Sequence, residues 1–205
     1  MKEYYNSVEV KTMARERKFS TEELFQATEK ILLQYGYEGF TFSLLAEKIK
    51  VSRGAIYKYY ENKEELIFDY MIAEMETFLS KLSEIENQEG FSAQFDFLMN
   101  AIFAKTEIHT LIGVTQHIPV HSNKKIKDKK ARLDQFHLDM YKHLQNFIKL
   151  GRAERILKPE IPDGLILGFI FQSITIPNHF GITKDEWIHS IKEILSHGMF
   201  VESSN

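Results

Sequence analysis

Apolar residues recur at helical spacing along most of the chain. They fall three and four positions apart from Leu24 to Tyr35, and the same spacing returns after Asn62. Residues that can cap a helix stand before these segments, as Ser20 does with Glu23 three positions on. Only 4 prolines and 10 glycines interrupt 205 residues, which leaves little turn chemistry for a many-stranded β fold. The pattern predicts an all-α protein.

The first third of the chain is divided into helices by clear start and stop signals. The first helix is expected to begin after Ser20 and to end at Gly36 in a left-handed conformation. Two short helices are expected over residues 42–49 and 53–60, capped by Thr41 and Ser52. Asn62 and a glutamate three residues later form a further capping box, which opens a long helix.

Residues 87–90 mark a shift in composition, since all 8 histidines lie after residue 108. Helices are predicted beyond it over residues 91–104, 106–116, 125–150, 162–176 and 183–198, with Gly151 ending the third of these.

Two short helices joined by a tight turn indicate a helix-turn-helix. Ala46 supplies the small residue needed where the helices cross, and the inward positions are apolar: Leu45, Ile49, Val51 and Ile56. The alternative is a small helical domain with a solvated basic face. Capping, turn length, small residue and charge all favour the helix-turn-helix.

The net charge of −3 gives no sign of a nucleic-acid partner, but the charge is unevenly distributed. Residues 48–63 hold 5 basic groups and 1 acid, and residues 11–18 hold 4 basic groups and 1 acid. Phosphate affinity depends on such local clusters through counterion release.

These segments resemble the TetR family of bacterial regulators over about 50 residues: GYEGFT at 36–41, LA at 45–46, VSRGAIYKYY at 51–60 and NKEEL at 62–66. The resemblance implies a basic arm over residues 1–19 and a helix-turn-helix DNA-binding domain over 20–66. It also implies an effector-binding and dimerisation domain over 67–205. Lys50 stands where the family usually has glycine, and Tyr60 where it usually has phenylalanine.

The resemblance also implies roles for individual residues. Arg53, Gly54, Ala55 and Lys58 correspond to positions that meet base edges. Thr41, Ser43, Tyr57, Tyr59 and Lys63 correspond to positions that hold phosphates. The chemistry agrees, because arginine or lysine can read guanine, an alanine methyl can meet thymine, and hydroxyls suit phosphate oxygens.

The predicted helix over residues 162–176 is apolar on nearly every face, which is typical of a helix buried on both sides. With the last helix it is predicted to form a homodimer interface, through Leu165, Phe169, Trp187, Ile191, Ile194 and Leu195. An ordinary core helix within one chain is the alternative.

Aromatic and thioether side chains are frequent between residues 91 and 150, and they predict a pocket for a hydrophobic or aromatic small-molecule effector. The candidate lining residues are Phe95, Met99, Phe103, Phe136, Met140, Tyr141 and Phe147, with His109, Gln116 and Gln172 as polar anchors. Plain core packing is the alternative.

Several other classes are disfavoured. With no cysteine there is no disulfide or thiolate site, and Glu186 and His189 form only one copy of a motif that di-iron sites need twice. We therefore expect no metal and no cofactor. No catalytic motif is found, so we expect no enzyme. No apolar stretch approaches the ~20 residues that span a bilayer, so we expect no membrane partner and a cytoplasmic location.

The combined prediction is a DNA-binding transcription regulator. It would be a repressor that a small effector releases from a palindromic double-stranded operator. A ligand-independent adaptor that binds DNA and positions a protein partner is the alternative.

Overall fold

The computed structural model describes residues 19–104, 111, 113, 118–119 and 123–200. Within these residues the architecture is helical, and a single β-bridge joins Leu157 to Phe200. The helices are α1 (Thr21–Gly39), α2 (Phe42–Lys48), α3 (Arg53–Tyr57), α4 (Lys63–Leu82), α5 (Gly90–Ala104), α7 (Lys124–His143), α8 (Gln145–Ala153), α9 (Asp163–Gln172) and α10 (Lys184–Met199). Short 3-10 turns follow α4 at Ser83–Asn87 and α9 at Ser173–Thr175. None of these helices has both the length and the apolar character needed to cross a bilayer.

The predicted helix starts are largely confirmed by their caps. The Ser20 hydroxyl accepts a hydrogen bond from the Glu23 amide at 2.9 Å, and the Glu23 carboxylate accepts one from the Ser20 amide at 2.8 Å. Thr41 caps α2 in the same way through its hydroxyl. Ser52 is at the N-cap position of α3, but its side chain makes no cap hydrogen bond, so the prediction of a side-chain cap there was wrong.

Two positions in the N-terminal region have left-handed backbone. Gly36 has φ 66° and interrupts α1, which resumes for one more turn to Gly39, so the glycine kinks the helix rather than ending it. Lys50 has φ 54° in the turn between α2 and α3. The helix-turn-helix therefore keeps the turn geometry that favours glycine, with a lysine in that position.

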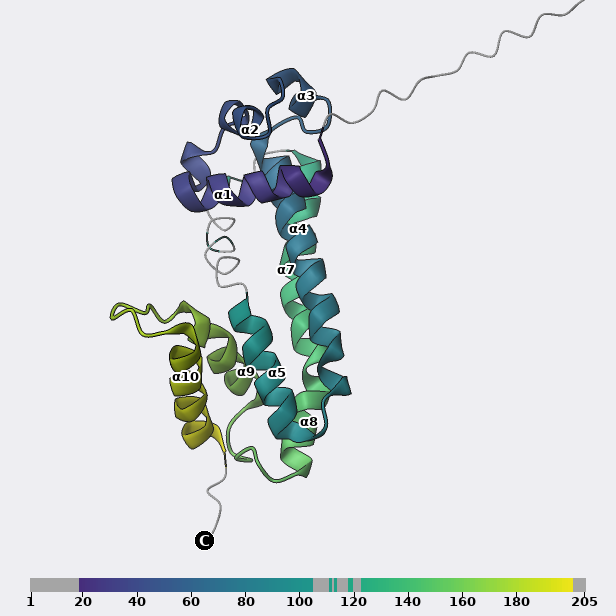
Figure 1. The fold of residues 1–205 in the computed structure, drawn as a ribbon. Helices are drawn as coiled ribbons and strands as arrows, with labels where there is room; N and C mark the ends of the chain where they lie inside the picture. The colour runs from purple at the N-terminus through teal and green to yellow at the C-terminus, as the bar shows by residue number, and fades with distance from the viewer. Residues whose placement is uncertain (1–18, 105–110, 112, 114–117, 120–122, 201–205) are drawn as a thin grey trace, which may run out of the picture.

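The apolar residues form two main cores at opposite ends of the molecule (Figure 1). The N-terminal core joins α1–α4 and also takes in Leu111, Ile118 and Ile126. The C-terminal core joins α5 and α8–α10 with the ends of α4 and α7. Helices α4 and α7 run side by side between the two cores, so both connect the ends of the molecule (Figure 1).

The C-terminal half differs from the prediction in two places. The segment predicted as one helix over residues 125–150 divides at Leu144 into α7 and α8. Gly151 does not end a helix but lies inside α8, where an added Cβ would be 2.6 Å from a ring carbon of Phe91. The residue is small because α5 packs against it. The helix expected over 106–116 falls almost entirely outside the described residues.

Candidate nucleic-acid interface

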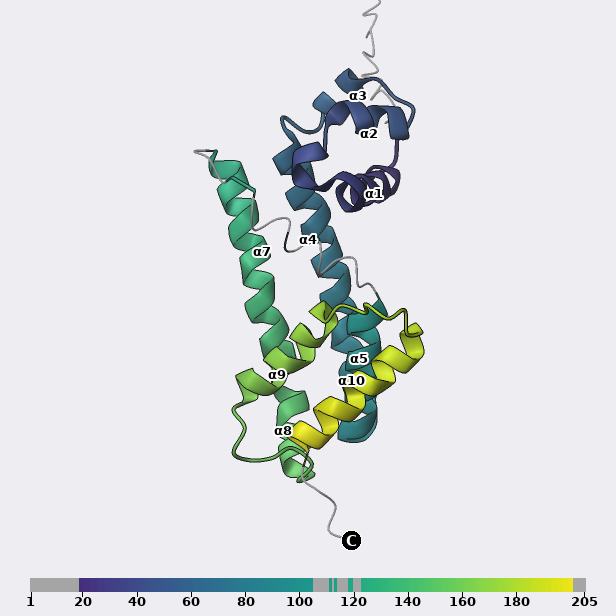
Figure 2. The ribbon, with the colours of Figure 1, turned by 90° about the vertical axis from the view of Figure 1, so that its left-hand side faces the viewer.

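Helices α2 and α3 lie together at one end of the molecule, far from α8 and α10 (Figures 1 and 2). Their crossing is built as the sequence predicted, because Ala46 and Ile56 are buried and the Val51 amide donates to the Ala46 carbonyl at 2.9 Å. The ring of Tyr57 packs edge-on against Phe42, with centroids 5.0 Å apart. These contacts fix α3 on the domain and leave its other face to solvent.

Seven of the nine predicted DNA-contact residues are exposed on this domain: Thr41, Ser43, Arg53, Gly54, Tyr57, Lys58 and Tyr59. Ala55 is not, because it is only 9% exposed and belongs to the N-terminal core. Its predicted contact with a thymine methyl stays a prediction. Lys63 is partly buried at the start of α4.

Arg53 is the first residue of α3, and its guanidinium Nη1 donates to the Ser43 hydroxyl of α2 at 3.2 Å. A guanidinium carries five N–H donors, so this bond leaves donors for a base edge or a phosphate. The hydroxyl orients the arginine on the exposed face without neutralising its charge.

Lys63 is held by Tyr37 at the end of α1. Its Nζ donates to the Tyr37 carbonyl at 2.8 Å and lies 4.0 Å from the centre of the Tyr37 ring. The Tyr37 hydroxyl in turn donates to Glu64 at 2.5 Å. Burial and the neighbouring Glu64 raise the pKa of Tyr37 far above its ordinary value, so the phenol stays neutral. The Lys63 ammonium is thus held between the start of α4 and the end of α1.

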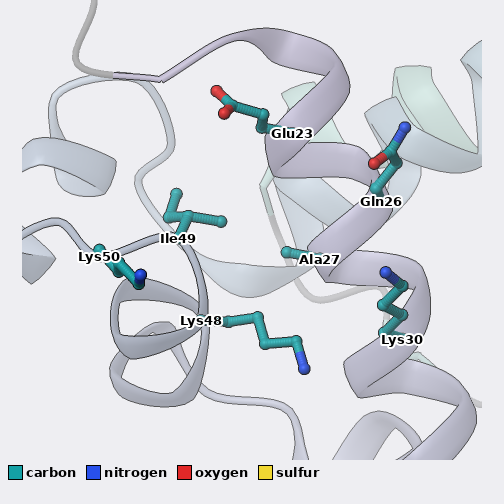
Figure 3. Close-up of a pocket in the computed structure, with 7 residues that line it drawn as sticks. All are labelled: Glu23, Gln26, Ala27, Lys30, Lys48, Ile49 and Lys50. Carbon is teal, nitrogen blue, oxygen red and sulfur yellow. The ribbon is translucent and has the colours of Figure 1, made fainter.

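A groove of about 280 Å³ opens between α1 and the turn after α2 (Figure 3). Three lysines line it: Lys30, Lys48 and Lys50. The carboxylate of Glu23, on the same groove, is already bonded to the Ser20 amide. Lys30 is not among the residues predicted from the sequence, because only the packing of α1 places it beside the other two lysines.

The basic residues of this domain share a further property. Within described residues 19–63, none of the six lysine and arginine side chains pairs with a carboxylate: Lys30, Lys48, Lys50, Arg53, Lys58 and Lys63. Elsewhere most basic side chains do pair, as Lys129 does with Asp69 and Lys192 with Asp96. An uncompensated cluster of cations is what phosphate binding by counterion release requires.

The residues predicted for an effector pocket are mostly core residues. Phe95, Met99, Phe103, Met140 and Phe147 are buried in the C-terminal core, and Tyr141 packs at its edge. Phe136 is buried in a separate small cluster with Ile72 and Met75 on α4. Gln172 is exposed, and His109 and Gln116 lie outside the described residues.

The residues predicted for the dimer interface fall into an exposed group and a group that is buried or partly buried within the chain. Leu165 and Phe169 on α9 and Ile194 on α10 are exposed, the last by 72%. Ile191 and Leu195 are buried within the same chain, and Trp187 packs partly on the C-terminal core. The first group and the exposed part of Trp187 are accessible to another molecule.

Among the described residues, no three histidine, aspartate or glutamate side chains converge as metal ligands would.

Comparisons with known proteins agree with this arrangement. Residues 24–70 match the model of a family described as bacterial regulatory proteins, tetR family. An uncharacterised HTH-type transcriptional regulator of Bacillus subtilis, YhgD, is 38% identical over 55 residues, which span 25% of this chain and 29% of the relative.

Solved structures resemble the chain over most of its length. The ketosteroid transcriptional regulator KstR2 of Mycobacterium tuberculosis has a TM-score of 0.68 at 17% identity, covering 89% of this chain and 95% of its own. FadR of Bacillus subtilis, in complex with stearoyl-CoA, has a TM-score of 0.65 at 21% identity. The match covers 87% of this chain and 99% of the FadR chain. A putative transcriptional regulator of Saccharomonospora viridis, in complex with choline, has a TM-score of 0.69 at 12% identity. The match covers 89% of this chain and 98% of that structure's chain.

The structure defines a helix-turn-helix at the N-terminal end of the described residues, followed by further helices. Residues 24–70 match the tetR family of bacterial regulatory proteins, and the solved structures share the helical fold of the whole chain. The family resemblance predicted from the sequence is confirmed over residues 24–70, and the all-α fold is confirmed for the described residues.

Proposed function

We propose that this chain is a homodimeric repressor that binds a palindromic operator and leaves it when a small hydrophobic molecule binds the C-terminal domain. The observation that carries the DNA-binding part is the set of unpaired cations around α3, which no carboxylate within the domain neutralises. Phosphate groups would supply the missing counter-charges. Under this proposal residues 20–66 bind DNA, residues 1–19 extend the basic surface, and residues 67–205 bind the effector and the second subunit.

Within the DNA-binding domain the exposed residues have two kinds of role. Arg53 and Lys58 read base edges from α3, and Gly54 lets its backbone approach them closely. Thr41, Ser43, Tyr57 and Tyr59 contact phosphates through their exposed hydroxyls, and Lys63 does so through its partly buried ammonium. Ala55 offers little contact surface, because it is mostly buried. The left-handed Lys50 adds a phosphate contact beside the α2–α3 turn.

The homodimer forms through α9 and α10. Leu165 and Phe169 are 50% and 57% exposed, and Ile194 is 72% exposed, although each is a large apolar side chain. An exposed apolar patch of this kind usually marks an interface. A two-fold dimer would place one α3 in each half-site of a palindrome, one helical turn or more apart.

The effector is proposed to be hydrophobic because the C-terminal core is rich in aromatic and thioether surface. The Phe91 ring stacks on those of Phe147 and Phe95, with centroids 4.7 Å and 6.3 Å apart. Apolar surface is therefore continuous between α5 and α8. The stearoyl-CoA of the FadR structure is a ligand of this chemical class. To release DNA, the ligand must bind one arrangement of the two DNA-binding domains more tightly than the other.

Selection from a pool of random duplexes tests the proposal. The full-length protein should enrich a palindrome, and native mass spectrometry of the same preparation should show a dimer with a co-purified apolar ligand. If no sequence is enriched, the proposal that the protein binds a specific operator is overturned. Enrichment with no ligand, and no release by any acyl compound, would favour the adaptor instead.

A further inference from the structure

Glu65 is the only charged residue among the buried side chains that the structure describes, with 4% of its surface exposed. A buried carboxylate costs free energy unless partners compensate for its lost hydration. One oxygen, Oε2, accepts a hydrogen bond from the Glu61 amide at 3.1 Å, and the other, Oε1, forms an ion pair with Lys125 Nζ. Both carboxylate oxygens are therefore occupied, each by a different element of the fold.

The two partners come from different elements of the fold. Glu61 lies in the short turn that connects α3 to α4, and Asn62 next to it caps α4 by accepting from the Glu65 amide at 2.8 Å. Lys125 lies in the first turn of α7. A single side chain thus links the exit of the recognition helix α3 to the start of α7.

Helix α7 reaches from this link into the C-terminal core. Ile126 at its start is buried in the N-terminal core, and Met140 near its end is buried in the C-terminal core. Its 20 residues span ~30 Å as one continuous helix. Further ion pairs, Lys129–Asp69 and Arg132–Glu76, follow the Glu65 pair down the contact between α7 and α4.

The burial of Glu65 does not neutralise it. Burial by itself would raise the pKa of the carboxyl group. The hydrogen bonds from Lys125 and Glu61 and the charges of Lys125 and Lys129 outweigh that effect and lower the pKa. The group stays ionised at neutral pH, so its link to Lys125 is a charge-assisted one.

We propose that Glu65 is a positioning residue through which a movement of α7 reorients the α3–α4 turn, and with it the recognition helix. The proposal rests on the operator binding proposed above and names the route by which the C-terminal domain would control it. Coupling between two sites requires a physical element that both of them bias. Here that element is α7, held at one end by the effector domain and at the other by the Glu65 carboxylate.

Substitution of Lys125 tests the link with little disturbance, since its side chain is half-exposed. Lys125→Met removes the ammonium and keeps the alkyl chain. Lys130→Met is the matched control, because Lys130 pairs with Asp134 inside α7 at 2.8 Å and that pair does not reach α4. Lys125→Arg restores the cation, and Lys125→Gln serves if the methionine variant does not fold.

Two readouts are needed, with full-length protein throughout. The first is affinity for the duplex that the wild-type protein selects, compared with a random duplex. We expect Lys125→Met to bind the selected duplex at least about fivefold more weakly, to bind the random duplex unchanged, and to be rescued by Lys125→Arg. The second is hydrogen exchange of the Glu61 amide without DNA, which should quicken in Lys125→Met and not in Lys130→Met.

Each contrary result has a defined meaning. Equal loss on both duplexes would make Lys125 a phosphate contact and overturn the proposal. Equal behaviour of Lys125→Met and Lys130→Met would overturn it too, as would failure of Lys125→Arg to rescue binding. If the wild-type protein selects no sequence, the operator proposal fails by itself, and exchange at Glu61 still decides whether Glu65 links α7 to the turn.

Discussion

The guanidinium of Arg53 donates to the hydroxyl of Ser43 at 3.2 Å, which joins the first residue of α3 to α2. Both side chains are exposed, so the hydrogen bond is made in solvent and contributes little to folding. Its effect is to fix the direction of the arginine. A side chain that already points in one direction loses less conformational entropy when it binds.

Arg53→Ala should therefore weaken binding to the selected operator by about 1–3 kcal/mol and relax its sequence preference at one base pair. Ser43→Ala should reduce the free energy of operator binding by less, about 0.5–1.5 kcal/mol, because it removes one hydrogen bond and leaves the Arg53 cation in place. Fluorescence anisotropy on the operator and on single-base variants measures both. Equal losses of Arg53→Ala on specific and random duplexes would instead identify Arg53 as a phosphate contact.

Lys63→Ala should weaken binding to every duplex and reduce the slope of log affinity against log salt by about 0.9, the value for one phosphate contact. The tether to Tyr37 keeps this ammonium in place before DNA arrives. Lys81→Ala is the control on the same helix, since Lys81 pairs with Glu84 at the far end of α4. A slope unchanged from wild type would exclude Lys63 from the interface.

Acid should remove a stabilising contribution of Glu65. Its pKa is lowered in the folded protein, so the contribution is present above the unfolded value of 4.5 and is lost as pH falls through the folded value. Glu65→Gln keeps an acceptor for the Glu61 amide and lacks the charge. The difference in unfolding free energy between wild type and Glu65→Gln should thus be constant near neutrality and shrink below about pH 4.5. Urea titrations across pH measure it, with exposed Glu47→Gln as control. If the difference in unfolding free energy between wild type and Glu65→Gln does not change with pH, the ionised Glu65 carboxylate does not stabilise the fold.

Aspartate on the exposed apolar face should dissociate the dimer. Ile194→Asp and Phe169→Asp would each bury a charge between subunits, at a cost of several kcal/mol, enough to raise the dimer dissociation constant at least about a hundredfold. Leu138→Asp is the control, because Leu138 is 56% exposed on α7. Light scattering after size exclusion gives the oligomeric state. Dimers that persist in both test variants would move the interface away from α9 and α10.

The features that the sequence predicted well are those with local causes. Ser20 and Thr41 cap helices through bonds to residues three positions away, and the spacing of such pairs can be read directly. The left-handed backbone at Lys50 was not predicted, because the sequence shows only that a lysine stands where the family usually has glycine. The division of α7 from α8 could not be read, because Leu144 is apolar and continues the helical pattern through the break.

Features that depend on distant partners escaped the sequence. Ala55 was assigned to the DNA surface by resemblance, and only the packing of a five-residue helix shows that it faces inward. The Lys125 pair with Glu65 joins residues 60 positions apart, with no periodic signal between them. Charge composition alone did not show that the cations around α3 are unpaired, because pairing depends on which helices lie together.

Gly151 also depends on residues distant in the sequence, and its contacts lead to a testable prediction. An alanine Cβ there would lie 2.6 Å from a Phe91 ring carbon and 2.7 Å from Leu157 Cδ1, and both neighbours are buried. Phe91 also stacks on Phe147, so its ring has little room to retreat. Gly151→Ala should destabilise the fold by about 1–3 kcal/mol despite the higher helix propensity of alanine.

Gly198→Ala is the matched control for this substitution. It lies inside α10 with no atom within 4 Å of an added Cβ, so propensity alone should act and the variant should be neutral or slightly more stable. Thermal and urea unfolding of the two variants give the comparison. A Gly151→Ala protein as stable as wild type would mean that α5 and α8 can separate without cost, and the close approach would not be what requires glycine.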